Sequence, residues 1–328
     1  MHDFIAIGDI VSDAFIKLKE ASVHCDIDTD QCTITMPFAE KIPYDSVEVV
    51  NAVGNSPNAA TAAARLGLKS ALITNMGKDE EGKKCLEKLQ SENIDTQFIS
   101  VHEGIKTNYH YVLLYEADRT ILVKHEEYPY RLPEIGEPKW VYLSSLGNTT
   151  ETYHQEIARY LNTHPNIQLA FQPGTFQLML GYEKLQDIFK RTKVFVCNVT
   201  EAEKVLEIDT LGINELLKRV KELGPEIVII TDGAKGAYAY DGTTIYEQSL
   251  YPDPKPPVDR TGAGDAFAST AVSALALGKD LSTALQWGAI NSMAVVQEIG
   301  AQKGLLTLPK IEEYLKKAPA EFQTKTIS

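Results

Sequence analysis

The sequence DRTGAGDAF, residues 259–267, is followed by a run of small apolar residues, ASTAVSALALG, that ends at Gly278. The run predicts a buried helix, and Gly278 is a suitable residue to end it. The segment before it, YPDPKPPV, is rich in proline and cannot form a central strand. TGAG is therefore predicted to be a loop that leads into the N-terminus of a helix.

Such a loop is suited to bind an anion. The first N–H groups of a helix have no partner within the helix, and the positive end of the helix dipole lies beside them. Glycine allows the backbone to approach a phosphate closely. A buried helix with Asp265 as its capping residue would need no ligand, but it would leave the two glycines and the polar DRT unexplained. We therefore expect an anion site.

Several common catalytic motifs are absent. GAGDAF does not match the dinucleotide fingerprint, because Phe267 stands where a third small residue is needed and no strand leads in. The chain has no G-x-x-x-x-G-K-[ST], no H-E-x-x-H and no G-x-S-x-G. P-loop enzymes, zinc peptidases and serine hydrolases of these types are thus excluded.

Apolar runs of strand length alternate with helical patterns along most of the chain. This alternation predicts an α/β fold with a mostly parallel sheet. Runs of strand length include FIAIGDIV (4–11), SALITNMG (70–77), KWVYLSS (139–145), IQLAFQP (167–173) and EIVIIT (226–231).

Residues 14–50 and 96–125 interrupt this rhythm. Both segments lack a good helix and contain patterns typical of half-exposed antiparallel strands. We expect them to form one small β-sheet that stands off a single domain covering residues 1–328. Edge strands of the main sheet are the alternative.

Composition limits the partners and the compartment. The 328 residues carry a formal net charge of −13, and Lys and Arg are scattered, so we expect no nucleic-acid partner. We expect no membrane association and a cytoplasmic location, because no run approaches the length of a membrane span and the first residues do not resemble a signal peptide. Cys25, Cys32, Cys85 and Cys197 lack close metal-ligand spacing. Cys25 and Cys32 could pair in an exposed insertion, but we expect free thiols.

DRTGAGDAF resembles the second signature of the ribokinase-like carbohydrate kinases, the PfkB family. Four further segments resemble motifs of that family and occur in the family order, between about Ile5 and Gly304. They are GDIVSD (8–13), VGNSPNAATAAARLG (53–67), NVTE (198–201) and TDGAKG (231–236).

The resemblance implies a three-layer α/β/α core of about nine strands with a small β-sheet lid. It also implies transfer of the γ-phosphate of ATP to a hydroxyl of a small sugar or sugar-like substrate. In this scheme Asp265 is the general base, because the helix N-terminus favours its ionised form. The backbone of Gly262, Ala263, Gly264 and Asp265 would form the anion hole.

The resemblance further implies cofactor sites. Asn198 and Glu201 would hold Mg²⁺ through water, although both residues also suit the start of a helix. Thr231, Gly233 and Gly236 would bind the nucleotide, although TDGAKG is equally consistent with a glycine-rich turn.

Asp259, Thr261 and the backbone near Gly300 resemble the loop that binds a monovalent cation such as K⁺ in some members. Arg260 stands where threonine is common.

Substrate contacts are implied for Asp13, Gly54 and Asn58. Asp13 is expected at the end of the first strand, where a carboxylate can bind vicinal hydroxyls. Val53 stands where the family usually has the first of two glycines. This pair is the expected hinge of the lid, so the substitution affects that expectation. FQPGTFQ, residues 171–177, departs from the family pattern, so no ligand is assigned there.

No motif separates the classes of substrate. A nucleoside kinase, or a sugar or nucleoside sensor without catalysis, remains open on the same fold. Exposed strand edges and aromatic residues of the lid also predict a homodimer formed through the lids.

Overall fold

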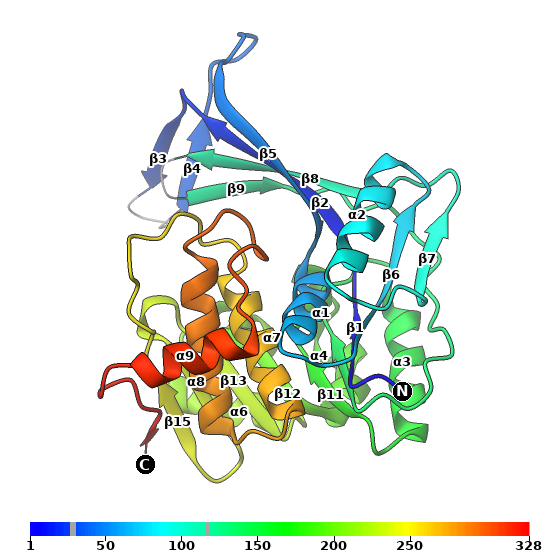
Figure 1. Cartoon of the computed structure of the whole chain (residues 1–328), viewed down its shortest axis with the longest axis vertical. Coiled ribbons are helices and arrows are strands. Elements are labelled where there is room, and N and C mark those ends of the chain that lie inside the picture. Colours follow the sequence, from blue (N-terminus) through cyan, green and yellow to red (C-terminus); the bar gives the residue numbers. More distant parts are fainter. Residues whose placement is uncertain (27–30, 116–117, 328) are drawn as a thin grey trace.

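A computed structural model describes residues 1–26, 31–115 and 118–327 of the chain. Its body is one large sheet between two layers of helices, and a smaller sheet stands above the body (Figure 1). This arrangement confirms the predicted α/β class and the predicted small separate sheet.

The large sheet has ten strands in the described residues, where about nine were expected. The first seven strands pair in parallel and the last three are antiparallel, so the sheet is mostly parallel as predicted. Their order is β7 (Ile99–His102), β6 (Ser70–Gly77), β1 (Phe4–Ile7), β10 (Trp140–Leu143), β11 (Gln168–Phe171), β12 (Thr192–Asn198), β13 (Ile227–Thr231), β14 (Ala237–Tyr240), β15 (Ile245–Gln248) and β16 (Lys325–Ile327).

Alternate residues of each central strand enter two separate cores, because successive side chains point to opposite faces of a sheet. Phe4 and Ala6 pack with one layer of helices, and Ile5 and Ile7 pack with the other. The first layer contains α1 (Asn55–Arg65), α2 (Glu80–Ser91), α7 (Ala263–Ala276), α8 (Leu281–Val295) and α9 (Leu308–Lys317). The second contains α3 (Glu151–Thr163), α4 (Thr175–Arg191), α5 (Val199–Leu206) and α6 (Ile213–Glu222).

We call the small four-stranded sheet the lid sheet. It is built from β5 (Tyr44–Val53), β2 (Val11–Leu18), β8 (Asn108–Tyr115) and β9 (Asp118–Leu122), in that order. Its first segment begins before residue 14 and continues past residue 50. The second segment is shorter than expected, because β7 pairs in parallel with β6 at the edge of the main sheet. The expectation that residues 99–102 belong to the lid was therefore wrong, and the alternative of an edge strand in the main sheet applies to them.

A separate hairpin of β3 (Ser22–Asp26) and β4 (Gln31–Thr35) extends from the lid sheet (Figure 1). Antiparallel pairing places Cys25 directly opposite Cys32, and the two sulfurs form a disulfide. The expectation of free thiols was wrong at these two positions, because only the register of the hairpin reveals their proximity. Cys85 and Cys197 are free and buried.

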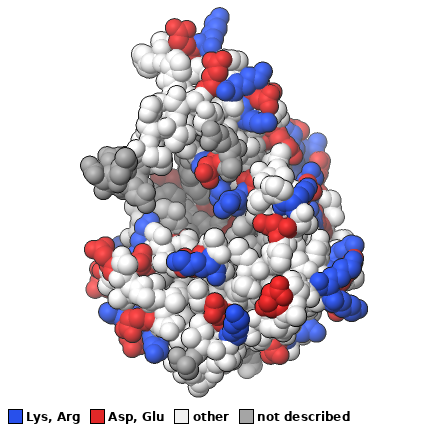
Figure 2. All heavy atoms as spheres, turned by 90° about the vertical axis from the view of Figure 1, so that its left-hand side faces the viewer, with Lys and Arg blue, Asp and Glu red and all other residues white. Residues whose placement is uncertain are grey.

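On the face shown in Figure 2, Lys and Arg side chains are interspersed with Asp and Glu. Among the helices in the described part of the chain, none has the length and apolar character to cross a membrane.

Candidate active site

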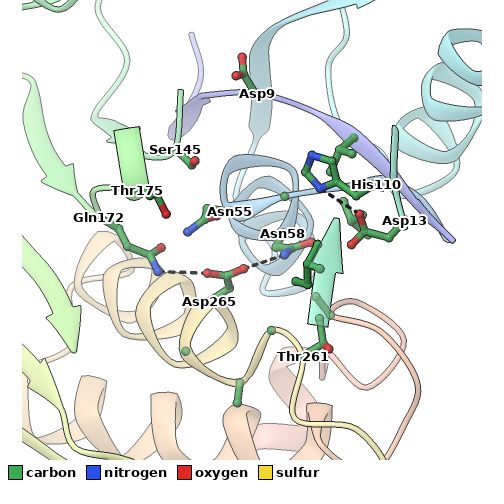
Figure 3. A pocket seen from close by; sticks show the side chains of 18 of the residues that line it. Asp9, Asp13, Asn55, Asn58, His110, Ser145, Gln172, Thr175, Thr261 and Asp265 are labelled. Carbon is green, nitrogen blue, oxygen red and sulfur yellow. Dashed lines mark hydrogen bonds and ion pairs between the residues drawn. The ribbon is translucent and has the colours of Figure 1, made fainter. Parts of the chain in front are cut away.

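A cavity of about 560 Å³ lies between the carboxyl ends of the central strands and the lid sheet (Figure 3). The core supplies residues that follow β1, β10, β11 and β12, together with the N-terminus of α7. The lid sheet contributes Asp13 from β2, His110 from β8, and Arg119 and Ile121 from β9. Parallel strands end at one edge of their sheet, which is the usual location of sites in α/β folds.

The loop before α7 has the conformation that its glycines suggest. Gly262 is the N-cap residue, with φ of 79°, and a Cβ there would lie 2.2 Å from the Cβ of Ala301. The N–H groups of Gly264 and Asp265 lie in the first turn, where no intrahelical acceptor is available, and both residues line the cavity. The alternative in which Asp265 is the capping residue is wrong, because Gly262 occupies that position.

The Asp265 side chain accepts hydrogen bonds from two amides instead. Asn58 Nδ2 donates to Oδ2 at 2.9 Å, and Gln172 Nε2 donates to Oδ1 at 3.1 Å (Figure 3). Burial raises the pKa of this carboxyl above its usual value, while the two amide hydrogen bonds and the positive charge of Arg119 act in the opposite direction. The result is a fixed carboxylate with increased affinity for a proton.

Gln172 belongs to the segment that sequence reasoning left unassigned. It follows β11, and its Oε1 accepts a hydrogen bond from the buried Tyr142 hydroxyl. The one sequence feature that could have indicated a site residue here is that Gln172 directly follows a predicted core strand.

Asp13 on β2 and His110 on β8 lie opposite each other on paired strands of the lid sheet. His110 Nδ1 is 3.5 Å from Asp13 Oδ1. Within the described part of the chain, Asp13 Oδ1 and His110 Nε2 are buried without a hydrogen-bond partner. Both residues line the cavity. His110 was not predicted from the sequence.

The expected position of Asp13 at the end of the first strand was wrong, because it lies within β2 of the lid sheet. Asp9 follows β1 instead, and its buried carboxylate accepts hydrogen bonds from the Tyr130 hydroxyl and the Gly147 N–H. His125 Nδ1 lies 3.2 Å from the same carboxylate.

Gly54 is the N-cap residue of α1 and also lines the cavity. Its φ is 116°, and a Cβ there would lie 2.9 Å from the carbonyl oxygen of Asp9. Val53 has no left-handed conformation; the neighbouring Ala52 has φ of 60° instead. The left-handed backbone at the base of the lid sheet therefore lies at Ala52, a residue with a small side chain, and not at Val53.

Asn198 and Glu201 form the capping box of α5 and line the cavity. Each side chain accepts a hydrogen bond from the backbone N–H of the other at 2.9 Å. Burial raises the pKa of Glu201, and the negative charge of Asp265 adds to this shift. A buried carboxyl group that lies in the field of a second carboxylate is a suitable environment for a cation.

No cluster of three or more His, Cys, Asp or Glu side chains that could hold a metal occurs in the described residues. Mg²⁺ commonly keeps several waters and uses only one or two carboxylates together with substrate phosphates. The residues present therefore fit Mg²⁺ bound with a phosphate ligand.

A smaller hollow of about 130 Å³ adjoins the cavity, and Thr231, Ala263 and Gly264 line both. Gly233 and Gly236 line the hollow only. Gly236 has φ of 95°, and a Cβ there would lie 2.2 Å from the Gln248 carbonyl oxygen. After this segment the chain forms the antiparallel hairpin of β14 and β15.

Asp259, Thr261 and Gly300 are also brought together, beside the anion loop. Asp259 is buried; its Oδ1 accepts hydrogen bonds from Thr261 N and Oγ1, and its Oδ2 accepts one from Gly300 N at 2.9 Å. Only Thr261 of these three lines the cavity. Asp259 thus ties the anion loop to the loop at residue 300.

Known proteins with a similar sequence or fold are kinases. The pattern of the pfkB family carbohydrate kinases matches residues 17–308. A ribokinase of Bacillus subtilis is 28% identical over 270 residues, which are 80% of this chain and 87% of the relative. A 5-dehydro-2-deoxygluconokinase of the same organism is 25% identical over 311 residues, which are 88% of this chain and 93% of the relative.

Two solved structures show the same fold. A nucleoside kinase of Methanocaldococcus jannaschii has a TM-score of 0.80 and 21% identity, with 96% of this chain and 98% of that chain covered. A putative ribokinase II from E. coli, in complex with ATP and Mg²⁺, has a TM-score of 0.73 and 17% identity, with 97% and 100% covered.

Substituting Gly262 tests the close approach of the anion loop to Ala301. In Gly262→Ala the left-handed backbone costs about 1–2 kcal/mol of the free energy of unfolding, and the overlap with Ala301 costs about 1–3 kcal/mol more. Gly278→Ala is the matched control, because Gly278 has φ of 76° and no atom within 4 Å of the added Cβ. Chemical denaturation of both variants measures the difference, and equal losses would contradict the packing described.

Proposed function

The chain belongs to the PfkB family of carbohydrate kinases, and from this premise we propose that it is an ATP-dependent kinase for a hydroxyl of a small sugar or sugar-like substrate. One observation carries the proposal. The Asp265 carboxylate is held by two amides at the N-terminus of α7, inside the cavity and beside N–H groups that are free to bind an anion. A proton acceptor beside an anion site is what phosphoryl transfer to an alcohol requires.

The mechanism follows from this placement. The sugar lies under the lid sheet with hydroxyls on Asp13 and His110, and its reacting hydroxyl points to Asp265. As that oxygen forms a bond to the γ-phosphorus, its proton passes to Asp265 and the bond between the γ-phosphorus and the bridging oxygen breaks, which releases ADP. The N–H groups of Gly264 and Asp265 stabilise the charge on the transferred group.

The nucleotide occupies the adjoining hollow, with Thr231, Gly233 and Gly236 along one side. A structural neighbour with ATP and Mg²⁺ bound supports this assignment of cofactors. Mg²⁺, when bound, neutralises phosphate charge, and Asn198 and Glu201 are the residues that would hold it through water. A monovalent cation such as K⁺ would be placed beside Asp259, Thr261 and Gly300.

The substrate end of the cavity favours a ligand with several hydroxyl groups. Asp13 offers a carboxylate, Asn55 and Asn58 offer amides, and Ser145 and Thr175 offer hydroxyls, all along the wall of the cavity (Figure 3). A nucleoside also carries such hydroxyls on its ribose, so a nucleoside kinase is the second candidate.

Replacing the proposed base tests the reaction. Asp265→Asn keeps the shape of the side chain but cannot accept the proton, and we expect kcat to fall about 100-fold to 10,000-fold. The measurement is ADP release with Mg²⁺-ATP against pentoses, hexoses, hexose phosphates, keto-deoxy acids and nucleosides. Asp209→Asn, at an exposed position outside the cavity, is the matched control.

Two outcomes would reject the proposal. Retained activity in Asp265→Asn would exclude this residue as the base. A wild-type protein that releases no ADP with any substrate, yet melts at a higher temperature in the presence of one, would instead be a sensor.

His110 tests the proposed substrate contact. In His110→Ala one hydrogen bond to the substrate is lost, so we expect the KM for the sugar to rise about 2-fold to 10-fold with little change in the KM for ATP. Tyr111→Phe is the control, since Tyr111 is the next residue on β8 and faces away from the cavity. An unchanged sugar KM in His110→Ala would remove this residue from the site.

The outer face of the lid sheet supports a homodimer. The register places Val49, Ala14, Tyr111 and Leu122 in one row across the four strands, opposite the face that lines the cavity. Three of these four side chains are between 44% and 52% exposed, and only Ala14 is buried. A second copy of the chain would cover this row.

Leu122→Arg should therefore shift the protein toward monomer in sedimentation velocity, because it places a charge in the proposed interface. Met179→Arg, at an exposed apolar residue of α4 in the main domain, should not. A wild-type monomer at all concentrations would contradict the dimer.

A further inference from the structure

Gln302 lies between the lid sheet and the residues that hold Asp265. Its side chain is 2% exposed. Its Nε2 donates to two acceptors at once, the carbonyl oxygen of Ala52 at 2.7 Å and Asn58 Oδ1 at 3.0 Å.

The direction of these hydrogen bonds follows from the groups at each end. An ionised carboxylate only accepts hydrogen bonds, so Asn58 must turn Nδ2 toward Asp265. Its Oδ1 then points away and needs a donor. A backbone carbonyl also only accepts, so the one arrangement that satisfies Ala52 and Asn58 has the Gln302 amide nitrogen facing both of them.

The contact with Ala52 connects Gln302 to the lid sheet, because Ala52 lies at the base of that sheet. It is the penultimate residue of β5, its φ is 60°, and it comes two residues before the N-cap residue of α1. The Gln302 side chain therefore joins the end of a lid strand to the amide that contacts the carboxylate.

The backbone of Gln302 is itself held in place. Arg65 Nη1 donates to the carbonyl oxygens of Gln302 at 2.8 Å and Leu305 at 2.7 Å, and Arg65 also pairs with Glu92. The donor is thus anchored independently of the lid sheet.

We propose that Gln302 is a positioning residue that fixes the Asn58 amide against Asp265 and ties it to the lid sheet at Ala52. Its importance for catalysis rests on the proposed role of Asp265 as the base. Without the Gln302 amide, Asn58 Oδ1 has no donor in this arrangement, and the amide is free to rotate.

Loss of the Gln302 amide is expected to raise the pKa of Asp265. The hydrogen bond from Asn58 favours the ionised form of Asp265, so its loss raises the pKa of that carboxyl. A base must be deprotonated to act, so the fall in kcat/KM on the acid side should begin at a higher pH.

The test is the titration of Asp265 in the full chain, followed by NMR with ¹³C-labelled aspartate and assigned by the signal missing in Asp265→Asn. In Gln302→Met, which keeps the length but has no amide, we expect the midpoint to rise by roughly half a pH unit or more. Asn291→Ala is the control. This buried amide bonds Thr270 Oγ1 and the Leu306 N–H outside the cavity, so its loss should lower Tm without moving the titration.

A second comparison isolates the role of Asn58. In an Asn58→Ala background, Gln302→Met should cause no further shift, because the group through which it acts is gone. Should Gln302→Met not fold, Gln302→Leu, which also lacks the amide and carries no charge, takes its place. A titration that stays at the wild-type midpoint in a folded Gln302 variant overturns the proposal, whatever its Tm.

The NMR readout does not depend on activity. A titration that shifts in a protein without kinase activity would reject the proposed function and leave the positioning role of Gln302 intact. Kinase activity in the wild type with an unmoved titration in the variant would do the reverse.

Discussion

The site depends on how one buried carboxylate is held. Asp265 lies in the first turn of α7, and it receives amide hydrogen bonds from α1 on one side and from the end of β11 on the other. Burial opposes its ionisation, while the amides and the helix dipole favour it. These opposing effects require α1, α7 and the main sheet to meet within hydrogen-bonding distance, so the packing of the core sets the chemistry of the cavity.

The lid sheet completes the cavity with groups of a different kind. The core supplies amides, N–H groups and Asp265, whereas the lid supplies Asp13, His110 and Arg119. In the proposed reaction, groups from both the lid and the core bind the sugar, and its reacting hydroxyl points to Asp265 in the core. Because the site has groups from both parts, a substitution at the base of the lid sheet, where Ala52 has a left-handed backbone, would affect both the lid side and the core side of the cavity.

The sequence predicted what local patterns encode. Alternating apolar runs indicated the α/β class, strand alternation in two interruptions indicated the lid sheet, and the glycines of TGAG indicated the turn into α7. It did not predict relations that depend on pairing or packing. The place of β7, the Cys25–Cys32 disulfide and the hydrogen bonds of Gln172 and Gln302 all depend on residues distant in sequence or on the register of strands. Sequence reasoning misplaced Asp13 because β1 ends well before the apolar run FIAIGDIV ends.

The lid sheet also has a consequence for folding and for evolution. Val11 in β2 pairs with Asn108 in β8, and α1, β6 and α2 of the main domain lie between these strands in the chain. Pairing over so long a separation is entropically costly until the intervening core has folded, so the lid sheet should form late. Any contiguous piece of sequence that contains the lid sheet also contains α1, β6 and α2. A lid of different specificity could therefore be exchanged between relatives without the core only if both lid segments were replaced together.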